Sequence, residues 1–215
     1  MRQLRFARLS GAILFLCGIL SPGHGAFATF AIPNGKQEKI TVPTTFKDDN
    51  LSFICWPQGS YVASRSFLSD GSYKFQIQNQ VNGVKVSTGT VIKRPWQIYT
   101  NIALEVLYPD RSRKMEILFQ DFKEQEPLTT GRTYRVIGLF RYDHVLKTEI
   151  FHSEFWFEKE TLMIPGYGKL NGIMAYAWQV GDSSYYTRYF YSPQHKEIVY
   201  SSSAEDGFVK DCVLR

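Results

Sequence analysis

The feature that most constrains the fold is a strict alternation of polar and apolar residues over residues 73–78, Tyr-Lys-Phe-Gln-Ile-Gln. In an extended chain, the three apolar side chains would share one face and the three polar side chains the other. Such alternation is typical of a half-buried strand in an antiparallel sheet. Asn82-Gly83 follows, and residues 84–88 alternate again. Because both residues of a two-residue hairpin turn need positive φ, this dipeptide predicts a β-hairpin.

Segments of the same kind recur through the rest of the chain, and Gly, Pro, Asn and Asp separate them. The expected strands cover residues 61–67, 73–78, 84–88, 96–107, 114–122, 132–141, 146–157, 169–178, 185–191, 197–201 and 208–213. Helix signals are poor, because no segment combines good caps with a sustained 3.6-residue period. Many short strands with frequent turns predict an all-β fold: a single antiparallel domain, either a β-sandwich or a strongly curved, partly closed sheet.

The N-terminus has the pattern of a secretory signal peptide. Three arginines among the first eight residues precede the apolar run 12–20, helix-breaking Pro22 and the small-x-small sequence Ala26-Phe27-Ala28. This order predicts cleavage after Ala28. The alternative is an uncleaved anchor, but a spanning helix needs about 20 apolar residues. Lipidation of Cys17 is not expected, because the large residue Leu16 precedes it.

Three regions are expected on this basis: a signal peptide (1–28), an irregular segment with a possible edge strand (29–50) and the antiparallel β domain (51–215). After cleavage, no segment is long and apolar enough to span a membrane. We therefore expect a periplasmic protein, with association with the outer membrane or secretion as further options.

The charge balance argues against nucleic acid as a partner. The chain has 25 Lys and Arg residues against 20 Asp and Glu, a net charge of +5. Without the three arginines of the leader, 22 basic residues face 20 acidic ones. The dense basic patch of a nucleic-acid-binding protein is absent from this pattern.

Two cysteines remain after cleavage, Cys55 and Cys212. In the oxidising compartment of an exported protein, such a pair predicts a disulfide. The alternative is two separate buried thiols. Neither cysteine belongs to a motif with zinc-ligand spacing, so we expect no metal and no cofactor.

Three segments carry a resemblance to a known group of proteins. Residues 127–134 read P-L-T-T-G-R-T-Y, residues 160–166 read E-T-L-M-I-P-G, and residues 188–193 read R-Y-F-Y-S-P. In that order, they resemble the "P-L-x-x-G-x-x-aromatic", "E-x-V-x-V-P-A-G" and "Y-W-Y-A-P" motifs of a family of exported bacterial β-rich proteins of unknown function. The resemblance implies one antiparallel β domain in the periplasm or at the cell surface, and it implies no reaction.

The residues around position 188 are the candidate binding site. On a strand, Tyr185, Tyr189 and Tyr191 would share one face, and Arg188 would lie on the other. Tyrosine presents a flat apolar ring with a hydroxyl, which suits sugars and peptides. We expect ligand contacts at Tyr185, Arg188, Tyr189 and Tyr191. The alternative is ordinary cross-strand aromatic packing within the sheet.

A second candidate site is catalytic. His152 and Glu154 are two residues apart, so they share a face of a strand and could act as a base and its partner. No nucleophile motif accompanies them, and the alternative is an exposed polar face.

The leading functional hypothesis is a non-catalytic envelope protein that binds or scaffolds a polysaccharide, a lipid or a partner protein. The alternatives are a carrier for a lipid or another hydrophobic ligand, and a small hydrolase using His152 and Glu154. A solid aromatic core would favour a scaffold, an open aliphatic concave face a carrier, and polar groups converging on a cleft an enzyme.

Overall fold

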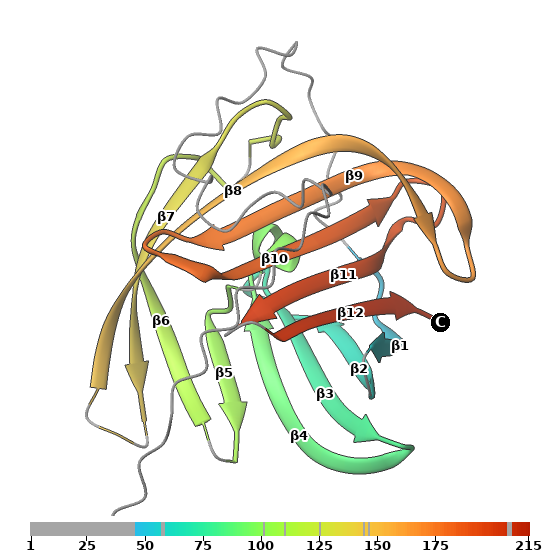
Figure 1. Cartoon of the computed structure of the whole chain (residues 1–215). Helices are drawn as coiled ribbons and strands as arrows, with labels where there is room; N and C mark the ends of the chain where they lie inside the picture. The colour runs from blue at the N-terminus through green and yellow to red at the C-terminus, as the bar shows by residue number, and fades with distance from the viewer. Residues whose placement is uncertain are drawn as a thin grey trace, which may run out of the picture.

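The computed structural model describes residues 46–215 except 57, 58, 101, 110, 125, 144, 146, 206 and 207, and leaves the side chains of 111, 183–185, 205 and 208 undescribed. Twelve strands in this part of the chain form one closed antiparallel barrel, shown in Figure 1. Each strand pairs with its neighbours in sequence, and β1 pairs with β12. The signal peptide and the possible edge strand before residue 46 lie outside the described residues.

The elements follow in chain order. They are β1 (Asp49–Trp56), β2 (Ser60–Phe67), β3 (Tyr73–Val81), β4 (Val84–Lys93), the 3-10 helix η2 (Pro95–Tyr99), β5 (Glu105–Tyr108), β6 (Arg111–Gln120), β7 (Tyr134–Tyr142), β8 (Lys147–Ile164), β9 (Gly168–Gln179), β10 (Asp182–Ser192), β11 (Glu197–Glu205) and β12 (Phe208–Leu214). Within the described residues, no helix is long and apolar enough to cross a membrane.

The expected all-β antiparallel class is confirmed, and the closed barrel fits the curved-sheet alternative rather than the sandwich. The predicted hairpin is also confirmed. β3 and β4 pair from Val81 opposite Val84 onward, with Asn82 at φ 52° and Gly83 at φ 76° between them. These are the positive φ values that a two-residue turn of this kind requires.

The disulfide lies at the seam where the barrel closes. Cys55 of β1 stands directly opposite Cys212 of β12, with Cα atoms 4.1 Å apart, and the two sulfurs are bonded. The predicted Cys55–Cys212 bond is therefore confirmed, and the alternative of two separate thiols is wrong. The bond joins the first and last strands, which no short turn connects.

The expectation of one strand over residues 96–107 is wrong. The chain forms η2, then an irregular segment, and only then the four-residue strand β5. Pro95 is the cause at the start, because its fixed φ and missing N–H suit the first position of a helix and not a ladder. The apolar residues of this segment pack inside the barrel: Trp96 stacks on Phe155 at 5.7 Å, and Tyr99 meets Phe157 edge-on at 5.9 Å.

Aromatic side chains from η2, β7, β8 and β10 fill part of the barrel interior. The fully buried side chains of this aromatic cluster include Tyr134, Phe155 and Phe157. Figure 1 shows the short helix of η2 within the curve of the strands, behind β10. The segment after β4 thus acts as an internal plug, and a cavity occupies another part of the interior.

Candidate functional site

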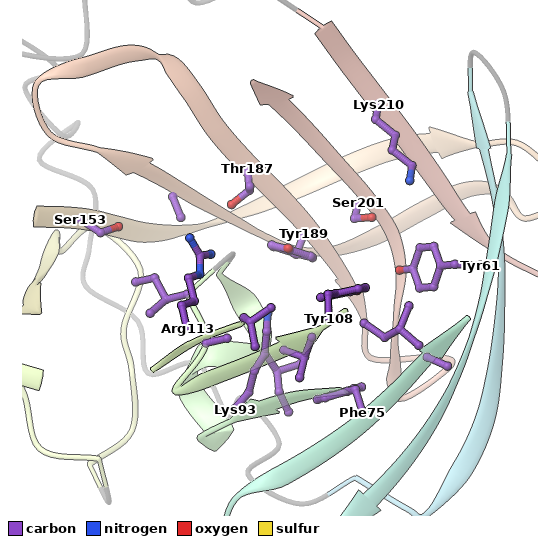
Figure 2. Close-up of a pocket in the computed structure, with 18 of the residues that line it drawn as sticks. Tyr61, Phe75, Lys93, Tyr108, Arg113, Ser153, Thr187, Tyr189, Ser201 and Lys210 are labelled. Atoms are coloured by element: carbon purple, nitrogen blue, oxygen red, sulfur yellow. The ribbon is translucent and has the colours of Figure 1, made fainter. Parts of the chain in front are cut away.

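The barrel encloses a cavity of about 650 Å³, shown in Figure 2. This volume lies within the range of about 300–1,000 Å³ that is usual for small-molecule sites. All twelve strands contribute at least one lining residue. Ile150 of β8 lines the cavity and is nevertheless 74% exposed. The cavity therefore opens to solvent near the start of β8.

A large part of the cavity wall is apolar. Its members come from β4, the plug segment, β5, β7 and β11, and include Val91, Ile98, Ile102, Val106, Phe140 and Ile198. The alternation expected for β3 holds here, since Phe75 and Ile77 line the cavity. Contact with such a wall stabilises a bound apolar group by about 25 cal/mol for each Å² removed from water.

Lys93, at the end of β4, brings a cation into the cavity. Its Nζ donates hydrogen bonds to the carbonyl oxygens of Gln97 (3.2 Å) and Thr100 (2.7 Å) in and after η2. It lies 5.9 Å from the ring centre of Tyr189. Burial lowers the pKa of Lys93 to about 7, because the charged form loses hydration.

A second lysine lies elsewhere on the cavity wall. Nζ of Lys210 on β12 is 5.9 Å from the ring centre of Tyr61, and burial lowers the pKa of Lys210. Burial also raises the pKa of Tyr61, against a smaller opposing effect of its hydrogen bond with Ser201. Figure 2 shows Lys210, Ser201 and Tyr61 turned toward one another.

Arg113 of β6 places a third cation on the cavity wall. Its guanidinium lies 4.5 Å from the ring centre of Phe140, and its side chain is hydrogen-bonded to Tyr142. Glu149 accepts a hydrogen bond from the Tyr142 hydroxyl (2.7 Å) and forms an ion pair with Lys147. The ammonium of Lys147, followed by the Tyr142 hydroxyl, lowers the pKa of Glu149.

A fourth cavity cation, Arg65 of β2, is neutralised within the wall. Its NH2 atom lies 2.7 Å from Oε2 of Glu197 and 3.0 Å from Oδ2 of Asp49, and its NH1 donates to the other oxygen of Glu197 at 3.2 Å. The Arg65 side chain is almost fully buried. This bidentate pair joins β2 to β11, which β1 and β12 separate in the sheet, and is structural in character.

The tyrosine-rich strand predicted from the sequence is β10, and its two faces have different surroundings. Tyr189 lines the cavity, as does Thr187 two residues earlier. Arg188 lies on the other face, where its NH2 atom donates to Ser202 at 3.3 Å. Tyr191 is buried in the aromatic core, edge-on to Tyr99 at 6.3 Å. The side chain of Tyr185 lies outside the described residues.

The residues of the hydrolase hypothesis lie on the face of β8 opposite to Ser153, which lines the cavity. Glu154 accepts a hydrogen bond from Nε of Arg135 at 3.1 Å. His152 and Glu154 share no hydrogen bond in the described part of the chain. Among the same residues, no group of three or more His, Cys, Asp or Glu side chains could hold a metal ion.

Sequence reasoning missed Lys93, Arg113 and Lys210. Arg113 stands between Ser112 and Lys114, so polar residues occupy both faces of β6 at that point and the pattern does not reveal which face is inside. Lys93 follows an alternating segment whose inner face contains Val91. If that alternation is continued by two residues, Lys93 falls on the inner face, and this signal could have placed it in the interior.

Comparisons with known proteins give one likeness and no family. No family model matches the chain, and no curated protein is significantly similar to it. A solved structure described as a "putative lipoprotein" from Parabacteroides distasonis is similar over 82% of this chain and 97% of its own, with 10% identity and a TM-score of 0.38.

Proposed function

We propose that this protein is exported to the cell envelope and binds a small amphipathic molecule inside its barrel. The observation that carries the proposal is the cavity of about 650 Å³, which combines an apolar wall with a few inward-pointing polar groups. Small-molecule sites generally have this composition, because apolar contact supplies affinity and a few polar groups fix orientation.

The carrier alternative is the hypothesis that fits this arrangement. A scaffold protein would be expected to fill its interior, and here the aromatic plug fills only a part of it. A hydrolase using His152 and Glu154 would need its catalytic groups beside the cavity, whereas both side chains are on the opposite face of β8 from Ser153. Export is supported by the leader pattern and by the disulfide, which suits an oxidising compartment.

A titration with a neutral fluorescent probe, N-phenylnaphthylamine, tests the binding proposal. We expect saturable binding of one probe per chain, with the rise in emission that follows transfer to an apolar site. Val106→Trp on β5 and Ala63→Phe on β2 each place a large ring in the cavity, and each should weaken binding at least tenfold, which is about 1.4 kcal/mol.

The matched control is Val209→Trp on β12. Val209 is 47% exposed and adjoins the cavity-lining Lys210, so its side chain faces outward. This variant should bind like the wild type. Thermal melts establish that each variant is folded, since a larger side chain in a packed interior typically costs about 1–3 kcal/mol. Absence of saturable binding, or equal binding by folded Val106→Trp and Ala63→Phe, would overturn the proposal.

A further inference from the structure

The cations that line the cavity are not balanced by the acids that line it. Among the described residues, Lys93, Arg113 and Lys210 form no ion pair, whereas Arg65 forms two. Two of the cavity acids are already paired, since Glu197 binds Arg65 and Glu149 binds Lys147 and Tyr142; the charge of Arg113 also lowers the pKa of Glu149, but less than Lys147 and Tyr142 do. Asp182, the third, also has a partner.

Lys93 has no counter-charge among the described residues, which is costly because its charged form loses hydration that no anion replaces. The lowered pKa of Lys93 expresses that cost. An anion bound in the cavity would offset this cost of lost hydration for each cation that it contacts.

Lys93 and Arg113 belong to one region of the wall. Val91 of β4 stands opposite Val106 of β5, and Val106 stands opposite Arg113 of β6. Lys93 is two residues beyond Val91 and therefore shares its face. Long side chains on this inner face extend into one space, and Figure 2 shows both cationic groups directed toward the side of the cavity where Tyr189 lies.

Unused hydrogen-bond donors are present in the same region. An ammonium group has three N–H donors, and two of those on Lys93 are used by the carbonyls of Gln97 and Thr100. From the opposite wall, Thr187 of β10 is 1% exposed, and its Oγ1 has no hydrogen-bond partner among the described residues. Buried hydroxyls are normally satisfied, and this one lines the cavity.

We infer that the cavity selects an amphiphile with a single carboxylate, whose head group is held by Lys93, Arg113 and the Thr187 hydroxyl while its apolar body lies along the wall of Val91, Val106 and Phe140. This inference rests on the proposed function and specifies its ligand class. A carboxylate accepts several hydrogen bonds at once, and charge-assisted bonds are about twice as strong as neutral ones.

The test compares an acid with its own ester. The probe is 11-(dansylamino)undecanoic acid, and the control ligand is its methyl ester, which keeps the apolar body and removes the charge. At about pH 6 the carboxylate is ionised and Lys93 is protonated. We expect the wild type to bind the acid at least tenfold more tightly than the ester, a difference of about 1.4 kcal/mol.

Lys93→Met and Arg113→Met, made separately, should each weaken acid binding about tenfold and leave ester binding within about twofold. Because the two residues lie on different strands, a folding defect in one variant leaves the other informative. The matched control is Arg141→Met, which removes a cation that is paired with Glu116 outside the cavity and should change neither affinity.

The outcomes separate the two proposals. Equal affinity for acid and ester, or loss of both ligands in a folded Lys93→Met or Arg113→Met variant, overturns the carboxylate inference and leaves the carrier proposal standing. Failure of the wild type to bind either dansyl ligand, together with failure to bind N-phenylnaphthylamine, overturns the carrier proposal itself.

Discussion

The Arg65 guanidinium is buried in the barrel wall, and its charge is balanced by Glu197 and Asp49. Removing one partner of a buried ion pair leaves the other charge uncompensated, which typically costs about 3–5 kcal/mol. We therefore expect Arg65→Met to lower the free energy of unfolding by about that amount in urea titrations.

The control for Arg65 is Arg141→Met. Arg141 pairs with Glu116 at 3.0 Å, but both side chains are more than half exposed. An exposed pair of this kind contributes about 0–1 kcal/mol. If the two variants lose the same small amount of stability, the Arg65 cluster contributes no more to the barrel than a surface pair does.

Lys93 makes stability depend on pH in a defined direction. Its pKa is about 7 in the folded protein and 10.5 when unperturbed, so between these values the unfolded chain binds more protons. Stability should therefore rise as pH increases from about 7 toward 10, by at most about 1.4 kcal/mol per pH unit, and should be lowest once the amine is charged in both states. The residue is only partly buried, so water in the cavity reduces this slope below its limit.

Denaturant titrations of the wild type and Lys93→Met between about pH 7 and 9 measure this effect. It appears as a difference in the slope of the free energy of unfolding against pH. Lys210 titrates in both proteins and cancels in the comparison. Tyr73, which stands opposite Lys93 on β3, has a pKa raised by burial and so stays neutral in this range. If the free energy of unfolding changes with pH in the same way for the two proteins, Lys93 is not desolvated.

At the scale of elements, the sequence was most informative where one strand turns directly into the next. Asn82-Gly83 identifies the β3–β4 hairpin, whereas β8 continues to Ile164, beyond the end expected at residue 157. Pairing of β1 with β12 has no local signal of this kind, because the two strands are at opposite ends of the domain. Only the Cys55–Cys212 pair pointed to that contact.

The difference between local signals and contacts distant in sequence also explains which residues of the site were predicted. Tyr189, which lines the cavity, was a candidate from the sequence because tyrosines repeat along one strand. Lys93 and Arg113 are brought together by the register of β4, β5 and β6, whereas Lys210 of β12 reaches the same cavity only because the barrel closes. Their convergence is a property of the tertiary structure, and a single strand pattern cannot contain it.

The seam between β1 and β12 gives a prediction about an element pair. The disulfide closes a loop with a sequence separation of 157 residues. In the chain-entropy model, constraining the unfolded chain over such a loop stabilises the fold by about 4–5 kcal/mol. The Cys55→Ser, Cys212→Ser double variant should lose stability of that order.

Reduction of the wild type should give the same loss, and reductant should have no effect on the double variant. Comparing the two separates the covalent link from the change of side chain. If the reduced protein unfolds at the same urea concentration as the oxidised protein, the seam is held by its ladder and packing alone.

For the whole molecule, the leader and the disulfide make a joint prediction about biogenesis. A signal peptidase that recognises Ala26 and Ala28 would release a chain beginning at Thr29. Export would then expose Cys55 and Cys212 to an oxidising compartment, where their bond is favoured. We expect protein isolated from the cell envelope to begin at Thr29 and to contain no free thiol.

N-terminal sequencing and thiol titration of the denatured, unreduced protein measure the two expectations separately. An Ala28→Arg variant removes the small residue at the cleavage position and should retain its leader, including Cys17, so it should carry one free thiol and begin at Met1. If the wild-type protein from the envelope also begins at Met1, cleavage does not occur. If it begins at Thr29 but carries two free thiols, the chain is processed and the barrel closes without its covalent link.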